Sequence, residues 1–376
     1  MDADQGHGVS ELFKAQSHLY KHIYYFIESM SLKCAVQLGI PDIIHKNNQP
    51  TTLPQLVSAL NIPVSKANFL QRLMRILVHS GVFDITKICE DQEGGGGGYV
   101  LTSSSRLLLK DSPANLSPAV LAVLDPVLLS PWFSLGQWIQ GEELTPFEAY
   151  HGTSFWEYGK RNIKFNNNLD EAMASDSQVA SLVVKEHKEI FESVDSLVDV
   201  GGGTGNLARS IAEAYPHMKC TVLDLPQVVA NLPESENLKF VGGDMFKSIP
   251  SADAIIMKSV LLHWSDEDCI KILKRCREAI PSTDDGGKLV LVEMVINDRK
   301  DEHELTKTRL FVDMEMMLIC NGRGRDEKEW KKLFLEAGFS HYKITATSGL
   351  NYIIEVYPLT TCFGFRMPFS LSLLTC

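Results

Sequence analysis

The second half of the chain alternates apolar segments with amphipathic ones from about residue 194 onward, and this pattern constrains the fold more than any other feature. The apolar segments read SLVDV (196–200), KCTVLDL (219–225), LKFVGGD (238–244), DAIIMKSV (253–260), KLVLVEMV (288–295) and NYIIEVYP (351–358). Buried strands that alternate with helices form a mostly parallel sheet with helices on both faces. We therefore predict a doubly wound α/β domain, whose last unit ends near Pro358.

The first part of the chain predicts a helical module followed by a hairpin. The segments 31–44 and 66–83 carry apolar residues at helical spacing, and TTLPQLVSAL (51–60) has the polar start and early proline of a capped helix. Two β-rich segments flank five consecutive glycines at 94–98, as expected at the tip of a hairpin. Three helices and a hairpin are typical of a winged-helix module.

The pattern is helical again from 112 to 190, and the residues after Pro358 fit neither a strand nor a strong helix. We therefore expect three parts. These are a helical, winged-helix-like domain (1–111), an α/β domain with a preceding helical segment at 112–190 (112–358), and an appended, disordered tail (359–376).

Charge and composition restrict the partners of this chain. Acidic side chains outnumber basic ones by 47 to 36, and the formal net charge of −11 would repel a nucleic-acid backbone. The N-terminus lacks the basic and apolar regions of a secretory signal, and no apolar run reaches the ~18–20 residues that span a membrane. The eight cysteines show no metal-binding spacing. We expect a cytoplasmic protein with reduced cysteines and with no nucleic-acid, membrane or metal partner.

The segment LVDVGGGTGNLARSIAEAYP (197–216) combines an apolar strand, a glycine-rich turn and an amphipathic helix. Gly201 and Gly203 let the backbone turn tightly and approach a ligand at the N-terminus of the helix. Such a turn is compatible with a dinucleotide, with another nucleotide or with no ligand, although Asn206 stands where the third glycine of a dinucleotide motif would fall. The turn alone therefore does not identify a ligand.

Three carboxylates, Asp199, Asp224 and Asp244, stand at the ends of the first three predicted strands. In an open parallel sheet these ends face one crevice, where a carboxylate can accept hydrogen bonds from both ribose hydroxyls of a nucleoside. Met245 stands beside Asp244, where it can flank an adenine. The negative charge of the set suits a cationic nucleoside without phosphates, and S-adenosylmethionine, which carries a sulfonium, is such a molecule. A single aspartate at such a position is more often a helix cap, so the cofactor interpretation depends on the three together with the glycine turn.

Several segments in the same order resemble the plant small-molecule O-methyltransferases, a family that includes caffeate, flavonoid, isoflavone and alkaloid O-methyltransferases. The segments are LVDVGGGTG, CTVLDLPQVV, GGDMF, WSDEDCIKILKRCREAIP, EKEWKKLFLEAGF and IIEVYP, and the resemblance extends from about residue 9 to residue 358. It implies S-adenosylmethionine-dependent methylation of a hydroxyl on an aromatic plant metabolite, such as an alkaloid or a flavonoid or isoflavonoid phenol. It also implies a Rossmann-like C-terminal domain and an N-terminal dimerisation domain that closes the partner's substrate pocket in a homodimer.

The resemblance also implies roles for individual residues. The family's cofactor contacts correspond to Gly201, Asp224, Asp244, Met245 and Lys258, to which the glycine turn adds Gly203 and Asp199. The acceptor pocket corresponds to Met173, Met314, Met317 and Asn321. Methionines form adaptable apolar walls around a flat ring. Met314 and Met317 fit equally well as core residues, and Asn321 as the cap of a helix end.

The catalytic positions depart from the family pattern. The family's base is a histidine two residues before the tryptophan of a W-S/N-D-E segment, and here that position is Leu262. His263 stands one residue later, just before the helix N-cap that we expect at Ser265. Of the family's two supporting glutamates, one corresponds to Glu293 and the other to Gly324. An imidazole base contributes about 10²–10⁴-fold to the rate of such a reaction. Its replacement by Leu262 therefore affects the step in which the acceptor loses its proton.

The catalytic candidates are therefore His263 and Glu293. His263 can act only if a shift of the loop brings it to the acceptor; otherwise it is a surface or loop-packing histidine, which is the more common role at such a position. Three interpretations remain open. The chain methylates by orienting a substrate that is already acidic or ionised. Alternatively, it binds the cofactor but has been repurposed, for example as a cyclase or isomerase. In the third interpretation it is an inactive partner in heterodimers with an active paralogue.

Overall fold

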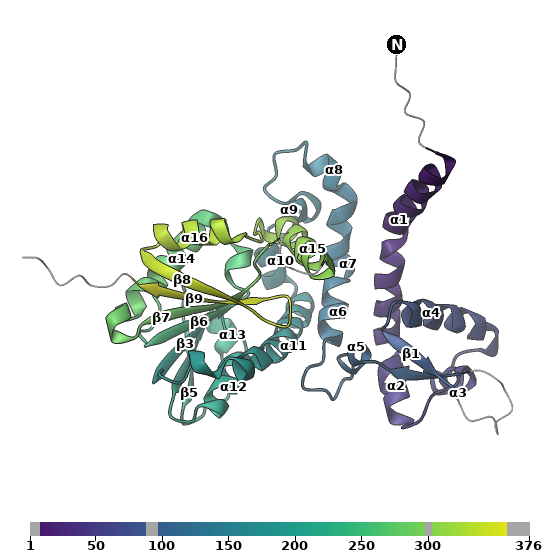
Figure 1. The fold of residues 1–376 in the computed structure, drawn as a ribbon, viewed down its shortest axis with the longest axis horizontal. Helices are drawn as coiled ribbons and strands as arrows, with labels where there is room; N and C mark the ends of the chain where they lie inside the picture. Colours follow the sequence, from purple (N-terminus) through teal and green to yellow (C-terminus); the bar gives the residue numbers. More distant parts are fainter. Residues whose placement is uncertain (1–7, 88–96, 298–302, 359–376) are drawn as a thin grey trace, which may run out of the picture. The chain divides into compact units, whose positions relative to one another are not determined.

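The computed structural model describes residues 8–87, 97–297 and 303–358 (Figure 1). The chain divides into two compact units, one formed by Met1–Gln140 and Trp156–Val179 and the other by Gly141–Phe155 and Ala180–Cys376. The predicted tail and most of the predicted glycine tip lie outside the described residues. Within the described ranges no single helix is long and apolar enough to cross a membrane, although Ser117–Val123 and Pro126–Trp138, bent by 43°, reach that length and composition together.

The first unit begins with helices and a hairpin, as predicted. They are α1 (Val9–Gln37), α2 (Ile40–Lys46), α3 (Leu53–Ala59), η1 (Val64–Lys66), α4 (Ala67–His79), β1 (Phe83–Thr86) and its antiparallel partner β2 (Gly98–Leu101). Helix α3 begins after Thr52, because the side chains of Thr52 and Gln55 each accept a hydrogen bond from the other's backbone N–H. Helix α4 buries Leu70, Met74 and Leu77, which share one face at helical spacing.

The segment 31–44, predicted as one helix, contains the end of one helix and the start of another. Helix α1 ends at Gln37 and α2 begins at Ile40, and Gly39 between them has a φ of 66°. Glycine adopts this left-handed conformation without a steric penalty. Pro41 then occupies the first turn of α2, where a backbone N–H is not required.

Residues 103–190 are largely helical, as predicted from 112 onward. The elements are α5 (Ser103–Arg106), α6 (Ser117–Val123), α7 (Pro126–Leu129), η2 (Ser130–Ser134), α8 (Leu135–Trp138), α9 (Pro146–His151), α10 (Phe155–Arg161), α11 (Ile163–Glu186) and η3 (Lys188–Ile190). Side-chain caps start several of them; for example, Asp125 accepts from the N–H of Val127 at 2.9 Å, and Thr145 from that of Glu148 at 3.1 Å. The predicted domain boundary at residue 111 stays a prediction; residues 112–140 belong to the first unit.

The second unit is built on a seven-stranded sheet in the order β5-β4-β3-β6-β7-β9-β8. The strands are β3 (Ser196–Val200), β4 (Lys219–Asp224), β5 (Leu238–Gly242), β6 (Ala254–Lys258), β7 (Lys288–Glu293), β8 (Phe339–Ala346) and β9 (Tyr352–Pro358). Strands β3 to β7 are parallel, whereas β9 pairs antiparallel with β7 and with β8. Because β3 has β4 on one side and β6 on the other, a ligand crevice is expected at the carboxyl ends of these strands.

Helices cover both faces of this sheet (Figure 1). The elements that follow the strands are α12 (Asn206–Ala214), α13 (Pro226–Val229), η4 (Leu261–His263), α14 (Asp266–Ala279), η5 (Thr283–Asp285), α15 (His303–Cys320) and α16 (Glu327–Glu336). Val198 of β3 packs in the apolar cluster that includes α14 and α16, whereas its neighbour Leu197 packs in the cluster that includes α12. The predicted doubly wound α/β architecture is confirmed.

Strand β8 is absent from the predicted set. Its sequence, FSHYKITA, alternates polar with apolar residues, and its burial alternates in the same way because it is an edge strand. The six predicted strands were recognised as apolar runs, a pattern typical of strands inside a sheet. Strand β5, at the opposite edge, was recognised as well because its sequence begins LKFV, with three apolar residues in four. The last strand nevertheless ends at Pro358, as predicted.

Candidate functional site

The glycine-rich turn joins β3 to α12 and leaves open space at one of its residues. Gly201 and Gly203 have φ of 70° and 57°, in the left-handed region that favours glycine. A Cβ on Gly201 would lie 2.9 Å from Cγ2 of Val260, so this residue allows close packing. A Cβ on Gly203 would meet no atom within 4 Å. The turn therefore packs against the protein at its start and faces an unfilled space at its centre.

Asp224 is the last residue of β4 and connects the two segments on either side of it. Its Oδ2 accepts a hydrogen bond from the N–H of Gly203 at 2.8 Å, and its Oδ1 accepts one from Leu225 at 2.7 Å. Its backbone oxygen accepts from the N–H of Gly243 at 2.9 Å, which anchors the segment that leads to Asp244. Burial raises the pKa of Asp224, and the two N–H donors oppose this effect. The carboxylate is thus held at the edge of the glycine turn.

Asp199, near the end of β3, is 2% exposed, and its Oδ2 has no hydrogen-bond partner in the described part of the chain. Burial, and then the charge of Asp224, raise the pKa of Asp199 to about 7, while Lys258 at the end of β6 lowers it. The structure therefore brings Asp199, Asp224, Lys258 and the glycine turn together at the carboxyl ends of adjacent strands. A buried carboxylate with one unbonded oxygen, beside an open glycine, fits a polar, positively charged ligand such as S-adenosylmethionine.

Asp244 and Met245 follow β5, which ends at Gly242, so Asp244 lies two residues beyond the strand rather than at its end. Oδ1 of Asp244 accepts from the N–H of Phe246 at 3.0 Å, and Oδ2 lies 3.4 Å from Nζ of Lys247. Met245 is partly buried against the apolar cluster between the sheet and α14. Asp244 thus stabilises a local turn, and its contact with the cofactor stays a prediction.

The predicted catalytic segment forms a short 3₁₀ turn, η4, between β6 and α14. The predicted N-cap is confirmed: Oγ of Ser265 accepts from the N–H of Asp268 at 3.2 Å. Leu262 and His263 therefore lie just outside the helix, as expected. Leu262 is buried, and His263 is half-buried.

The imidazole of His263 interacts with the backbone of its own turn. Burial lowers its pKa to about 4, and hydrogen bonds to the backbone of Val260 and Ser259 oppose this shift. The ring is therefore neutral at pH 7, and it is a weak base. The assignment of His263 as the catalytic base stays a prediction.

Glu293 ends β7 and supports the same turn from the sheet. It is fully buried; its Oε1 accepts from the N–H of Leu261 at 2.8 Å, and its Oε2 has no partner within the described residues. Burial raises the pKa of Glu293 to about 7, while the backbone N–H of Leu261 and the charge of Arg325 lower it. A carboxyl group with one free oxygen and this pKa can exchange a proton near neutral pH.

Gly324, where the resemblance implies a glutamate, packs too closely to accept a side chain without rearrangement. Its N–H donates to Oδ1 of Asp313 on α15 at 2.6 Å, and a Cβ would lie 2.6 Å from Cδ1 of Ile296. Neither Asp313 nor the buried Arg325 that follows Gly324 stands out in the sequence, because neither belongs to a recognisable motif. Within the described ranges, no three His, Cys, Asp or Glu side chains are grouped as a metal site.

The predicted acceptor residues lie on two helices that belong to different units. Met314 and Met317 are one turn apart on α15, and Met314 is 38% exposed. Asn321 follows α15 with a φ of 56°, the conformation with which asparagine ends a helix, so its alternative role as a cap is realised. Met173 lies on α11 and is 42% exposed. Their contact with an acceptor stays a prediction.

Comparison with known families matches the chain in two places. Residues 20–111 match the O-methyltransferase dimerisation domain, and residues 132–340 match the O-methyltransferase domain. The chain is 52% identical over 359 residues to the trans-resveratrol di-O-methyltransferase of Vitis vinifera, which covers 95% of this chain and 100% of the relative. It is 48% identical over 353 residues to the isoflavone-7-O-methyltransferase 9 of Medicago sativa, covering 94% and 98%.

Solved structures share the fold. Human N-acetylserotonin methyltransferase in complex with SAM aligns with a TM-score of 0.76 at 21% identity, over 96% of this chain and 100% of that one. A methyltransferase of calicheamicin biosynthesis in its SAH-bound form aligns with a TM-score of 0.78 at 24% identity, over 92% and 99%. The chain belongs to the plant O-methyltransferase family, and it is an S-adenosylmethionine-dependent O-methyltransferase with an N-terminal dimerisation domain.

The raised pKa of Glu293 makes the free energy of unfolding depend on pH. Because its pKa is raised from 4.5 to about 7, the folded chain keeps a proton that the unfolded chain releases. Its contribution to stability is complete below pH 4.5 and is lost as the pH rises through about 7. We expect Glu293→Gln to remove this loss, so that its free energy of unfolding relative to wild type improves by up to about 3 kcal/mol between pH 4.5 and 8.

Urea unfolding across this pH range measures the effect. Glu304→Gln changes an exposed glutamate on α15 and is the matched control. It should follow the wild-type curve. If the free energies of unfolding of Glu293→Gln and wild type change in parallel with pH, the raised pKa of Glu293 is contradicted.

Proposed function

We propose that the chain transfers a methyl group from S-adenosylmethionine to a phenolic hydroxyl of a flat aromatic plant metabolite, with a flavonoid, isoflavonoid or alkaloid phenol as the acceptor. The relatives at about half identity are named for resveratrol and isoflavone, which are planar phenols. The observation that carries the proposal is the unbonded, buried Oδ2 of Asp199, which lies beside Lys258 and the Gly203 turn in a chain of this family. We further propose a cytoplasmic location.

Bound S-adenosylmethionine supplies an electrophilic methyl group, so the protein's own task is to orient and deprotonate the acceptor. A phenol has a pKa of about 10, and moving its proton to a group of pKa about 4, such as His263, costs about 8 kcal/mol. Moving it to Glu293, of pKa about 7, costs about 4 kcal/mol. The free Oε2 of Glu293 also lies at the turn, since its Oε1 binds the N–H of Leu261. We therefore propose that Oε2 of Glu293 takes the proton, and we expect acidic phenols to be the best acceptors.

A second candidate follows from the replaced catalytic positions. Leu262 occupies the place of the family's base, and Gly324 is packed against Ile296 where a supporting glutamate would stand. In this case the chain binds the cofactor but has lost or changed methyl transfer, either as a repurposed cyclase or isomerase or as the inactive partner of a paralogue.

The two candidates are distinguished by an assay with methyl-labelled S-adenosylmethionine and a panel of stilbene, flavonoid, isoflavone and alkaloid phenols. The proposal predicts label in at least one phenol class, and predicts faster transfer to the more acidic members. Cofactor binding measured by calorimetry without transfer to any acceptor would support the second candidate.

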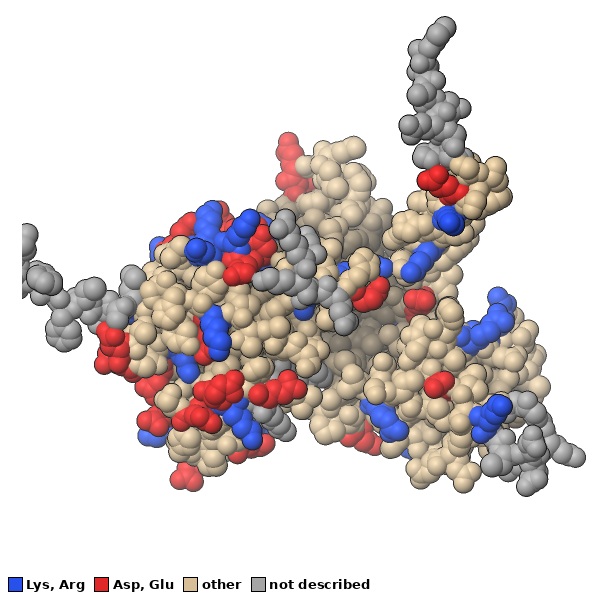
Figure 2. All heavy atoms as spheres, in the orientation of Figure 1, with Lys and Arg blue, Asp and Glu red and all other residues tan. Residues whose placement is uncertain are grey.

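We also propose that the chain is a homodimer, through the dimerisation domain that it contains. Large apolar side chains along α1 are exposed, among them Phe13 (63%), Ile23 (57%) and Phe26 (62%). Figure 2 shows few charged side chains over this helix, whereas acidic and basic side chains are intermixed over the α/β unit. Exposed apolar surface of this extent marks an interaction site.

We expect the double variant Ile23→Glu and Phe26→Glu to convert the dimer to a monomer, because it places two charges on a surface that a dimer would bury. Light scattering coupled to size exclusion measures the mass. Leu335→Glu on α16, a side chain 55% exposed, is the control and should remain dimeric. A double variant that stays dimeric would show that α1 is not the interface.

A further inference from the structure

The turn that carries Leu262 and His263 is held by hydrogen bonds to its backbone carbonyls. Nη1 of Arg325 donates to the carbonyl of Leu261 at 3.1 Å, and Nη2 donates to that of Trp264 at 2.8 Å. Between them, the backbone N–H of Arg323 donates to the carbonyl of Leu262 at 2.9 Å. One short segment thus binds three of the four carbonyls from 261 to 264.

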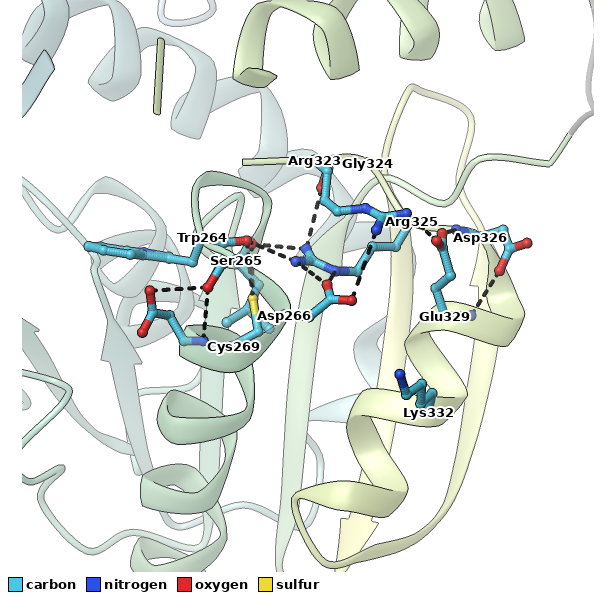
Figure 3. A network of polar contacts seen from close by, with 12 residues as sticks. Trp264, Ser265, Asp266, Cys269, Arg323, Gly324, Arg325, Asp326, Glu329 and Lys332 are labelled. Carbon is cyan, nitrogen blue, oxygen red and sulfur yellow. Dashed lines mark hydrogen bonds and ion pairs between the residues drawn. The ribbon is translucent and has the colours of Figure 1, made fainter. Parts of the chain in front are cut away.

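Arg325 also connects this turn to the helices on either side (Figure 3). Its Nε donates to Oδ1 of Asp266 at 2.9 Å, in the first turn of α14, and its guanidinium lies 5.4 Å from the ring centre of Trp330 on α16. The side chain of Arg325 is fully buried. A buried guanidinium is tolerated only when its charge is paired and its N–H groups are bonded, and here both conditions are met by the turn and by Asp266.

Gly322 brings the two segments into contact. A Cβ at this position would lie 2.1 Å from the carbonyl oxygen of Leu262 and 2.8 Å from Cα of His263. Any larger residue would therefore displace the turn. From the opposite side, Glu293 accepts the N–H of Leu261, so the turn is fixed both by the sheet and by residues 322–325.

We propose that Arg325 is a positioning residue. Together with Gly322 and the backbone N–H of Arg323 it forms a clamp, called here the 322–325 clamp, that fixes the register of the Leu261–His263 turn. In this register the His263 ring stays on its own backbone, away from the methyl acceptor. The inference rests on the proposed function, since the turn matters only if it lies beside the acceptor. The clamp explains why the adjacent histidine does not replace the missing one. Bringing His263 to the place of Leu262 requires a shift of the backbone, and that shift would break the hydrogen bonds from the buried Arg325 to the carbonyls of Leu261 and Trp264.

The test is an NMR titration of the His263 imidazole, assigned by comparison with His263→Gln, in the full-length protein. Arg325→Lys keeps a positive charge but cannot reach both carbonyls and Asp266 together. We expect the His263 midpoint to move from about 4 towards the ordinary 6.5 in this variant. We also expect the pH profile of methyl transfer to acquire a His263-dependent step, absent in the Arg325→Lys, His263→Gln double variant.

Arg323→Ala is the matched control, because Arg323 contributes to the clamp through its backbone N–H. Its side chain pairs with Glu329 and lies 3.9 Å from Oδ2 of Asp266, and it bonds none of the carbonyls of the turn. Its His263 midpoint should remain near 4. If Arg325→Lys does not fold, Gly322→Ala disturbs the clamp in a second way. It should also raise the midpoint of the His263 titration. Folded Arg325→Lys and Gly322→Ala proteins with an unchanged His263 titration would overturn the clamp. A wild-type protein that transfers no methyl group would instead contradict the proposed function, because the titration reads the turn without turnover.

Discussion

Asp224→Ala is expected to weaken the binding of S-adenosylmethionine by about 100-fold or more. The wild-type carboxylate can accept hydrogen bonds from the cofactor's ribose while its Oδ2 also holds the N–H of Gly203. Charge-assisted hydrogen bonds contribute about 1.5–3 kcal/mol each, so the loss of the ribose contacts alone accounts for about two orders of magnitude. The release of the glycine turn adds to this effect. Calorimetric titration with S-adenosylmethionine measures the affinity.

Asp253→Ala is the matched control for this experiment. Asp253 also accepts two hydrogen bonds, from the N–H and the hydroxyl of Ser196 at 2.8 Å each, but it lies at the opposite, amino end of the sheet. The control variant should lose stability and keep its cofactor affinity. If both variants bind the cofactor as wild type does, Asp224 is not a cofactor residue.

Leu262→His is expected to raise kcat/KM at pH 7 by about 100-fold or more for a phenol of ordinary acidity, because a positioned imidazole base contributes about 10²–10⁴-fold. The new ring would stand next to Leu261, whose N–H is bound by Glu293, and the free Oε2 of Glu293 is available to orient it. For a phenol that is ionised at the assay pH the gain should be small, because no proton has to be removed. Steady-state kinetics with the two kinds of acceptor separates these cases.

The control for Leu262→His is Leu262→Gln, which introduces a polar side chain of similar length that does not take up a proton. It should show no gain. Addition of Glu293→Gln to Leu262→His should remove most of the gain. A rate equal to wild type in a folded, cofactor-binding Leu262→His protein would show that residue 262 does not face the acceptor.

The sequence predicts the α/β fold well because its strands are buried on both faces. Continuous apolar runs such as AIIMK in β6, whose first four side chains are buried, have few alternatives to a central parallel strand. Strand β8 lies at the edge, so half of its residues face away from the core and it shows no such run. Likewise, the break at Gly39 was missed because the apolar spacing continues across it.

The two halves of the candidate site differ in how far they can be predicted. The glycine turn and Asp224 are adjacent to strand ends, and parallel topology alone brings strand ends together. Arg325 could not be recognised, because a buried arginine is indistinguishable in sequence from a surface one. Its role depends on the carbonyls of Leu261 and Trp264, which lie about sixty residues away in the chain. The pKa of His263 likewise depends on burial by neighbours that only the tertiary structure brings close.

We propose that Glu293, rather than His263, takes the proton of the acceptor. The pH dependence of kcat/KM with two phenols of different acidity, for wild type, His263→Ala and Glu293→Gln, tests it most directly. We predict a rise of about tenfold per pH unit that levels near pH 7 for both phenols, as set by the pKa of Glu293 of about 7, in wild type and in His263→Ala. In Glu293→Gln we predict that the levelling near pH 7 is lost and that kcat/KM instead rises with the ionised fraction of each phenol, up to that phenol's own pKa. A profile that is unchanged in Glu293→Gln and abolished in His263→Ala would contradict the account.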